Sequence, residues 1–130
     1  MKRTLFSALS ALLLGLMTLM PTAAAADEYH GQFHGLSNHV TTGGVTVVEM
    51  TDGSAVVILD SDFSLDGAPD ARVGLGNDGT YVPATDLGDL GPLTGMHIFV
   101  VPASIDVSDF NEVYIWCRQF AVPLGVASIS

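Results

Sequence analysis

Cys117 is the residue of this chain whose type could most directly carry chemistry, because it is the chain's single cysteine. A lone thiol cannot form a disulfide within its own chain, so it packs in the interior, bridges two chains, reacts, or binds a metal or cofactor. A bare nucleophilic thiol is disfavoured here, because the thiolate needs nearby cations, the domain is strongly acidic and the nearest cation is expected on the opposite face. A coordinated thiolate stays open as an alternative, because coordination itself removes the proton.

Histidines could supply further ligands, and the chain has four of them: His30, His34, His39 and His97. The i, i+4 pair His30 and His34 would share one face only on a helix, and the neighbouring glycines argue against a helix. We therefore expect both on the surface of a mobile start. A blue-copper site needs two histidines, a cysteine and usually a methionine. No histidine follows Cys117, which argues against that class, and the lack of a Cys-x-x-Cys-His motif excludes covalent c-type heme.

Four aspartates lie at spacings that could supply oxygen ligands to calcium: Asp60, Asp62, Asp66 and Asp70. An EF-hand loop requires glycine at its sixth position and glutamate at its twelfth, where this chain has Leu65 and Ala71. The EF-hand is therefore excluded. A looser calcium site and a solvated turn with Asx hydrogen bonds are the two alternatives. Asp70 could instead form an ion pair with Arg72 or Arg118.

The N-terminal segment has the three parts of a secretory signal peptide. Two basic residues precede an apolar run from residue 5 to residue 20, and a proline and four alanines follow. We therefore predict a signal peptide over residues 1–26 and an exported domain, periplasmic or extracellular, over residues 27–130. An uncleaved membrane anchor is the alternative, because the apolar run is at the short end of what spans a bilayer.

Charge is distributed unevenly between these two parts. Residues 27–130 contain all 14 acidic residues but only two basic ones, Arg72 and Arg118, so their formal charge is 2 − 14 = −12. This charge disfavours binding to nucleic acid or to an anionic membrane. It suits either docking to a cationic partner or metal ion, or a surface that keeps the protein dispersed in a salty exterior.

Short runs rich in valine and isoleucine, separated by Gly, Pro, Asp and Asn, predict an all-β chain. Asp52-Gly53 is turn chemistry and predicts a hairpin between the first two clear runs. Pro123 predicts an edge or a bulge in the last one. The count of about seven to eight short antiparallel strands predicts a β-sandwich. The runs cover residues 44–50, 54–59, 71–75, 80–82, 96–101, 112–118 and 120–128, with a loop at 85–95 and a turn or single helical turn at 106–111.

Alternation within 112–118 predicts which way Cys117 points. One set of side chains is uniformly apolar and is expected to face the core: Val113, Ile115 and Cys117. The other set has polar tips on large bodies and suits a half-exposed face: Tyr114, Trp116 and Arg118. Tyr114 and Trp116 are either the outer face of a packed strand or a partner-binding patch. The glycines of the chain are interpreted as turn residues, and no hydrolase or phosphate-binding motif is found.

The segment from Val113 to Ala127 resembles the closing segment of the DM13 family, a hydrophobic strand followed by Trp-Cys, two residues, an aromatic and a small-residue strand. Earlier motifs are similar in order and spacing, so the resemblance covers nearly all of residues 27–130. They are Gly31-Gln-Phe33, His39, Gly43-Gly44-Val45, Asp62-Phe63, Gly67-Ala-Pro-Asp70, Leu87-Gly88, Ile98-Phe99 and Pro102.

The resemblance implies a β-rich extracytoplasmic module of electron-transfer systems, whose cysteine acts as a free thiol or as a ligand to a prosthetic group such as heme. That position is Cys117 here, and His39, at the family's opening, is the best second ligand. We hypothesise a redox accessory that binds heme or a metal through these residues and works with a cationic redox protein or another extracytoplasmic protein. The alternatives are a non-catalytic interaction or structural module with a packing cysteine, and a calcium-stabilised domain.

Overall fold

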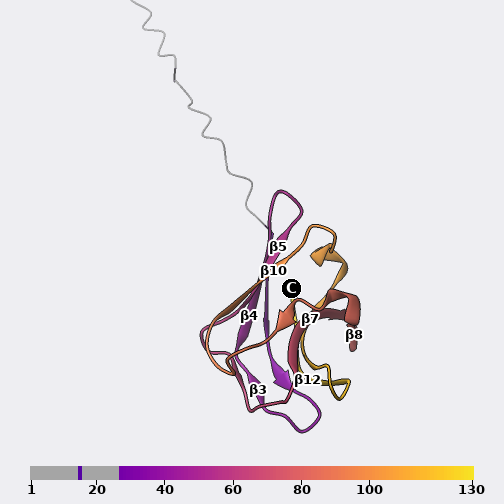
Figure 1. Cartoon of the computed structure of the whole chain (residues 1–130). Helices are drawn as coiled ribbons and strands as arrows, with labels where there is room; N and C mark the ends of the chain where they lie inside the picture. Colours follow the sequence, from indigo (N-terminus) through magenta and orange to yellow (C-terminus); the bar gives the residue numbers. More distant parts are fainter. Residues whose placement is uncertain (1–14, 16–26) are drawn as a thin grey trace, which may run out of the picture.

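The computed structural model describes residue 15 and residues 27–130 (Figure 1). The predicted signal peptide, 1–26, therefore lies outside the described residues apart from that one position. The described chain is nearly all β, with two main antiparallel sheets whose inner faces share one apolar core. This confirms the all-β sandwich. Among the described residues, no helix has the length and apolar character needed to cross a membrane.

The first sheet has four strands in the order β1-β4-β5-β10. Its members are β1 (Glu28–Gln32), β4 (Gly44–Glu49), β5 (Ala55–Leu59) and β10 (His97–Val101). The predicted hairpin is confirmed, because β4 and β5 pair antiparallel and Asp52 Oδ1 accepts a 2.9 Å hydrogen bond from the Ser54 backbone amide in the turn. The expectation of a mobile start was wrong. All five residues of β1 pair in register with β4, from Glu28 opposite Val48 to Gln32 opposite Gly44.

The second sheet has the order β2-β12-β11-β7-β8, with β9 also paired to β7. Its members are β2 (His34–Gly35), β12 (Val122–Ser128), β11 (Glu112–Cys117), β7 (Ala71–Asn77), β8 (Thr80–Val82) and β9 (Gly88–Asp89). A small third sheet pairs β3 (Thr41–Thr42) with β6 (Ser64–Leu65), and two 3-10 turns follow the chain at η1 (Pro83–Thr85) and η2 (Val107–Asp109). The turn or single helical turn predicted at 106–111 is thus confirmed by η2. The two-residue strands β2, β3, β6 and β9 were not predicted, because a strand of two residues is too short to show a period of two.

The core is formed by the inward-facing residues of β4, β5, β7 and β11. Eight of their valine, leucine and isoleucine side chains are completely buried: Val45, Val47, Val57, Leu59, Val73, Leu75, Val113 and Ile115. Burial of each such aliphatic side chain contributes about 1.5–3 kcal/mol, which favours the sandwich without any disulfide.

Pro123 lies at a β-bulge, as the sequence predicts. The register between β11 and β12 shifts there, because Ile115 pairs with Gly125 and Trp116 with Pro123, which leaves Leu124 as the extra residue. The carbonyl of Leu124 accepts hydrogen bonds from the Thr41 hydroxyl at 2.8 Å and from the Leu36 amide at 3.0 Å. The backbone carbonyl of the extra residue is therefore hydrogen-bonded by the loop after β2 and by β3.

Candidate functional site

Cys117 is the last residue of β11 and is 1% exposed. It pairs with Ala71 of β7 on one side and with Val122 of β12 on the other. Val113 and Ile115 of the same strand are also buried in the main core, so the predicted orientation of this set is confirmed. Arg118, the next residue, is exposed and forms an ion pair with Asp70, with Nε 3.0 Å from Oδ2. The predicted pairing of Asp70 with an arginine is therefore confirmed.

His39 is held elsewhere, by Asp66. Its Nδ1 lies 2.8 Å from Asp66 Oδ1, while Asp66 Oδ2 accepts a 3.0 Å hydrogen bond from the Val40 amide. The Val40 amide, and then His39, lower the pKa of Asp66. His39 is thus hydrogen-bonded to a carboxylate, whereas Cys117 is packed in the apolar core. Neither residue belongs to a group of three or more potential metal ligands within residues 27–130.

Asp66 is one of the four candidate calcium ligands, and the other three also have partners within the protein. Asp60 Oδ1 accepts from the Thr46 hydroxyl at 3.1 Å, Asp62 Oδ1 accepts from the Gly44 amide at 2.9 Å, and Asp70 binds Arg118. Over residues 27–130, no group of three or more His, Cys, Asp or Glu side chains is placed to hold a metal ion. The arrangement resembles the hydrogen-bonded turns that were the alternative to calcium.

A heme or metal at Cys117 does not fit this arrangement. The sulfur lies in the main apolar core, whereas the cleft found in the described chain opens on the opposite face of the same sheet. Cys117 is a free, buried cysteine, and it belongs to no group of three or more potential metal ligands in the part of the chain described. No step of a mechanism is therefore derived through a group on this sulfur.

The opposite face of the sheet carries a cleft of about 560 Å³. Its walls come from β2, β8, β11, β12 and the turn after β7, and they consist of His34, Leu36, Gly79, Thr80, Tyr81, Glu112, Tyr114, Trp116, Pro123 and Val126. Tyr81, Tyr114 and Val126 form a second cluster of buried residues, separate from the main core. The half-exposed position expected for Tyr114 was wrong, because this residue is only 2% exposed.

Two strand glycines allow the tyrosine rings to lie against the sheet. A Cβ atom at Gly74 would be 2.6 Å from Tyr81 Cε2, and one at Gly76 would be 2.6 Å from Tyr114 Cε2. Any larger residue at these positions of β7 would lift the rings away. The interpretation of the glycines as turn residues was therefore wrong at Gly74 and Gly76. The sequence signal was the alternation of Val73 and Leu75 with glycine, because glycine inside a strand often marks a close approach.

Two of the aromatic rings in the cleft wall are nearly parallel, and the third is steeply inclined to them. Tyr81 and Trp116 are stacked, with ring centroids 4.4 Å apart and planes 15° apart. Tyr114 meets Tyr81 edge to face, with centroids 5.7 Å apart and an angle of 64°. Burial raises the pKa of Tyr81 and of Tyr114 to about 12, with further contributions from Asp86 and Glu112 respectively.

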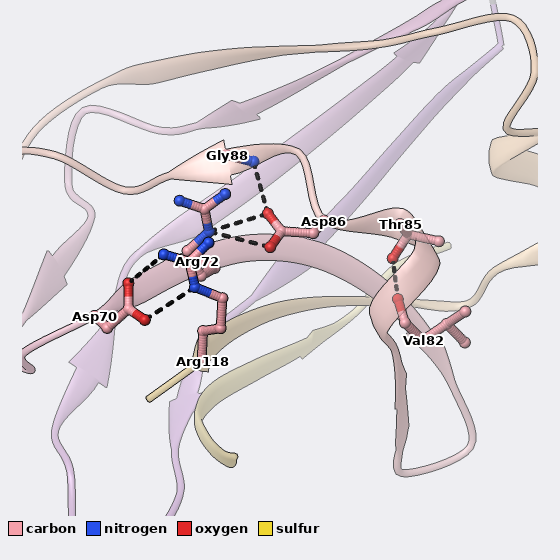
Figure 2. A network of polar contacts seen from close by, with 7 residues as sticks. All are labelled: Asp70, Arg72, Val82, Thr85, Asp86, Gly88 and Arg118. Carbon is pink, nitrogen blue, oxygen red and sulfur yellow. Dashed lines mark hydrogen bonds and ion pairs between the residues drawn. The ribbon is translucent and has the colours of Figure 1, made fainter. Parts of the chain in front are cut away.

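An ion pair fixes the segment that follows Tyr81 to β7 (Figure 2). Arg72 Nε contacts both carboxylate oxygens of Asp86, at 3.2 and 3.1 Å, and Asp86 Oδ1 also accepts from the Gly88 amide at 2.9 Å. The bond to Asp86 raises the pKa of Arg72. Thr85 donates to the Val82 carbonyl at 2.7 Å and accepts from the Leu75 amide at 2.7 Å. These contacts keep β8, and with it Tyr81, on the sheet.

Glu112 supplies the carboxylate of the cleft. Only 9% of the residue is exposed, and its Oε1 accepts hydrogen bonds from the Gly79 amide at 2.8 Å and from the Tyr114 hydroxyl at 3.3 Å. Sequence reasoning singled out Tyr114 and Trp116 as a patch but missed Tyr81 and Glu112. Tyr81 was missed because the sequence of a strand as short as Thr80–Val82 does not indicate which face of the sheet its side chains will cover.

Comparison with known proteins identifies one family. The family described as "Electron transfer DM13" matches residues 32–129, which include both the buried cysteine and the residues around the cleft. No curated protein matches the chain. No solved structure matches it either. Because the family match covers most of the chain, this protein belongs to the DM13 family, whose description is electron transfer.

Proposed function

We propose that this DM13 protein is an exported electron-transfer accessory that works with a separate redox partner, and in which Cys117 is a packing residue. The family description supports the electron-transfer role. The observation that carries the assignment of Cys117 is the burial of its sulfur in the apolar core, 1% exposed and at the end of a paired strand. Free cysteine is among the most buried residue types and commonly acts as a small hydrophobe.

Ligation of heme or a metal by Cys117, with His39 as the second ligand, is the competing hypothesis. It needs the sulfur to leave the apolar core. The bond between His39 Nδ1 and Asp66 is compatible with ligation through Nε2, because metal-binding histidines commonly bond a carboxylate through the other ring nitrogen. The change required at Cys117 would break contacts of the core, which is why we favour the packing role.

Absorption spectra separate these two hypotheses. The purified domain, residues 27–130, is mixed with hemin and, separately, with Cu²⁺, and the same is done with Cys117→Ala. We expect identical spectra for the two proteins, and a thiol reagent that reacts with the natural domain only after denaturation. A Soret shift or a thiolate charge-transfer band that disappears in Cys117→Ala would instead assign the sulfur as a ligand.

The charge of the domain favours a cationic redox partner. Two arginines against 14 acidic residues give −12, and complementary charge accelerates association at low salt. Binding of a basic cytochrome c is measured by calorimetry at low and high NaCl, with lysozyme as an equally basic control that carries no redox group. We expect salt-sensitive binding of the cytochrome that exceeds the binding of lysozyme. Equal binding of both proteins would reduce the partner proposal to nonspecific attraction.

Export is part of the same proposal. If the signal peptide is cleaved after one of the residues from Ala24 to Ala26, the mass of the protein recovered outside the cytoplasm should correspond to a start at Ala25, Ala26 or Asp27. A recovered protein that still begins at Met1 would favour the uncleaved anchor.

A further inference from the structure

We propose that the cleft bordered by Tyr81, Trp116 and Glu112 is a binding site for a planar aromatic cation. This inference rests on the cleft alone and does not depend on the electron-transfer role. The cleft has a volume of about 560 Å³, which is within the range of pockets that hold small molecules. Such pockets combine apolar walls with a few polar groups that orient the ligand, and both features are found here.

The shape of the apolar wall favours a flat ligand. Trp116 is only partly buried and lies nearly parallel to Tyr81, while Tyr114 stands at a steep angle to Tyr81. A planar ring placed on such a surface can stack on one ring system and meet the edge of another, which are the two arrangements that aromatic pairs prefer. The wall is prepared before any ligand arrives, because Gly74 and Gly76 leave room for the tyrosine rings.

Polar groups at this wall are left without protein partners. Within residues 27–130, the hydrogen bonds of Glu112 involve Oε1, and Oε2 accepts none. The Tyr81 hydroxyl and the Trp116 indole N–H have no hydrogen-bond partner among the described residues, yet neither is a fully buried unsatisfied group. They are therefore reached by solvent, and Glu112 Oε2, whose residue lines the cleft, is an acceptor for a donor on the ligand.

The charge of the site favours a cation. No lysine or arginine is found among the described residues that line the cleft, and the nearby Arg72 is neutralised by Asp86. An indole face attracts cations, the carboxylate of Glu112 adds to this attraction, and the domain as a whole carries −12. The same charges disfavour phosphorylated nucleotides and other anionic ring systems.

The chain offers a direct reporter of this site, because Trp116 is its single tryptophan. Methylene blue, a tricyclic aromatic cation, is titrated into the domain, residues 27–130, while the fluorescence of Trp116 is recorded. Resorufin, a tricyclic anion of similar size, is the matched probe. We expect saturable quenching by methylene blue and none by resorufin after correction for absorbed light. Equal quenching by both dyes would overturn the proposal.

Two pairs of variants test whether the cation binds in the cleft. Glu112→Gln and Asp52→Asn each remove one negative charge, at the cleft and at the distant β4–β5 turn, and Thr80→Arg and Thr51→Arg each add one positive charge at the same two places. We expect Glu112→Gln and Thr80→Arg to weaken binding roughly tenfold, and the turn variants to change it less than about twofold.

The melting temperature of each variant shows whether it is folded. Thr80 and Thr51 are both exposed, so their variants keep the test decisive even if Glu112→Gln unfolds the protein. Equal loss of affinity within each pair would mean that the dye responds only to net charge, which would overturn the assignment to the cleft. Displacement of the dye by a neutral oligosaccharide would overturn the choice of an aromatic cation.

Discussion

Cys117 has apolar surroundings because strand alternation turns it to the same side as Val113 and Ile115. The strand has partners on both sides, β7 and β12, so the sulfur is covered by neighbouring strands as well as by the facing sheet. Arg118 is on the other face and is held by Asp70. Cys117 therefore lacks the cationic and accessible surroundings that reactive cysteines have.

The burial of Cys117 predicts the order of stability of two small substitutions. Cys117→Ser should destabilise the domain more than Cys117→Ala, because a hydroxyl buried without a partner costs about 1–3 kcal/mol. Urea unfolding of both variants measures the difference. Equal free energies of unfolding would indicate that the sulfur site is open to water.

The tyrosines of the cleft predict how stability changes at alkaline pH. The pKa of Tyr81 and of Tyr114 is raised to about 12 in the folded protein, above the ordinary value of 10.0. Between these values the unfolded state loses its phenolic protons first, so stability is fully present below pH 10 and falls as the pH rises towards 12.

Urea unfolding at pH 9, 10 and 11 measures this loss of stability. We expect a smaller loss between pH 10 and 11 in Tyr81→Phe and in Tyr114→Phe than in the natural sequence. Tyrosinate absorbance near 295 nm should appear at lower pH in urea than in buffer. Coincident titration curves in both solvents would contradict the burial of these two tyrosines.

At the level of elements, β7 separates two packed layers. Its inward residues Val73 and Leu75 belong to the main core, while the outward glycines Gly74 and Gly76 lie under the tyrosine rings. Glycine inside a strand is unfavourable by itself, since it loses more conformational freedom than other residues. The gain is a close approach of β8 and β11 side chains to the sheet.

A double-mutant cycle tests this relationship. Gly74→Ala should cost about 1–3 kcal/mol in the natural sequence, because the new methyl group would overlap the Tyr81 ring. In a Tyr81→Ala background the ring is absent, and the same change should cost much less. Chemical unfolding of the four proteins gives the coupling energy. Additive effects would show that Gly74 does not make room for Tyr81.

At the level of the whole molecule, the main electrostatic feature is an excess of acid with few ion pairs. The described residues contain two arginine ion pairs, Arg72–Asp86 and Arg118–Asp70, whereas carboxylates such as Asp52 and Asp106 accept only local hydrogen bonds. A domain with a charge of −12 repels itself in the compact state, and added salt screens this repulsion.

Salt should therefore stabilise the domain. We expect the melting temperature of residues 27–130 to rise when NaCl is increased from 10 mM to 500 mM, because the self-repulsion is reduced more than the two ion pairs are weakened. Calorimetry at both salt concentrations measures the change. A melting temperature that falls would show that specific ion pairs, rather than net charge, dominate.

Strand content and the direction of Cys117 follow from local patterns, and the sequence by itself was sufficient for both. Five strands are long enough to show alternation or β-branched runs, and Asp52-Gly53 marks the turn between the first two. They cover residues 44–49, 55–59, 71–77, 97–101 and 112–117. The DM13 motifs are also local and ordered, so the family could be identified without coordinates. The start at Glu28–Gln32 was missed because its polar residues and glycine give no strand signal, and β4 supplies the pairing.

The cleft was decided only by the tertiary structure. Its residues come from positions 34 to 126, and they meet because β2 pairs with β12 while β8 folds back on β7. The partners of the Asp60–Asp70 side chains are likewise backbone amides, a hydroxyl, a histidine and an arginine of other segments. Alternation tells which face of a strand a side chain occupies, because it is a property of the local backbone. What covers that face depends on strand order, which long-range packing determines.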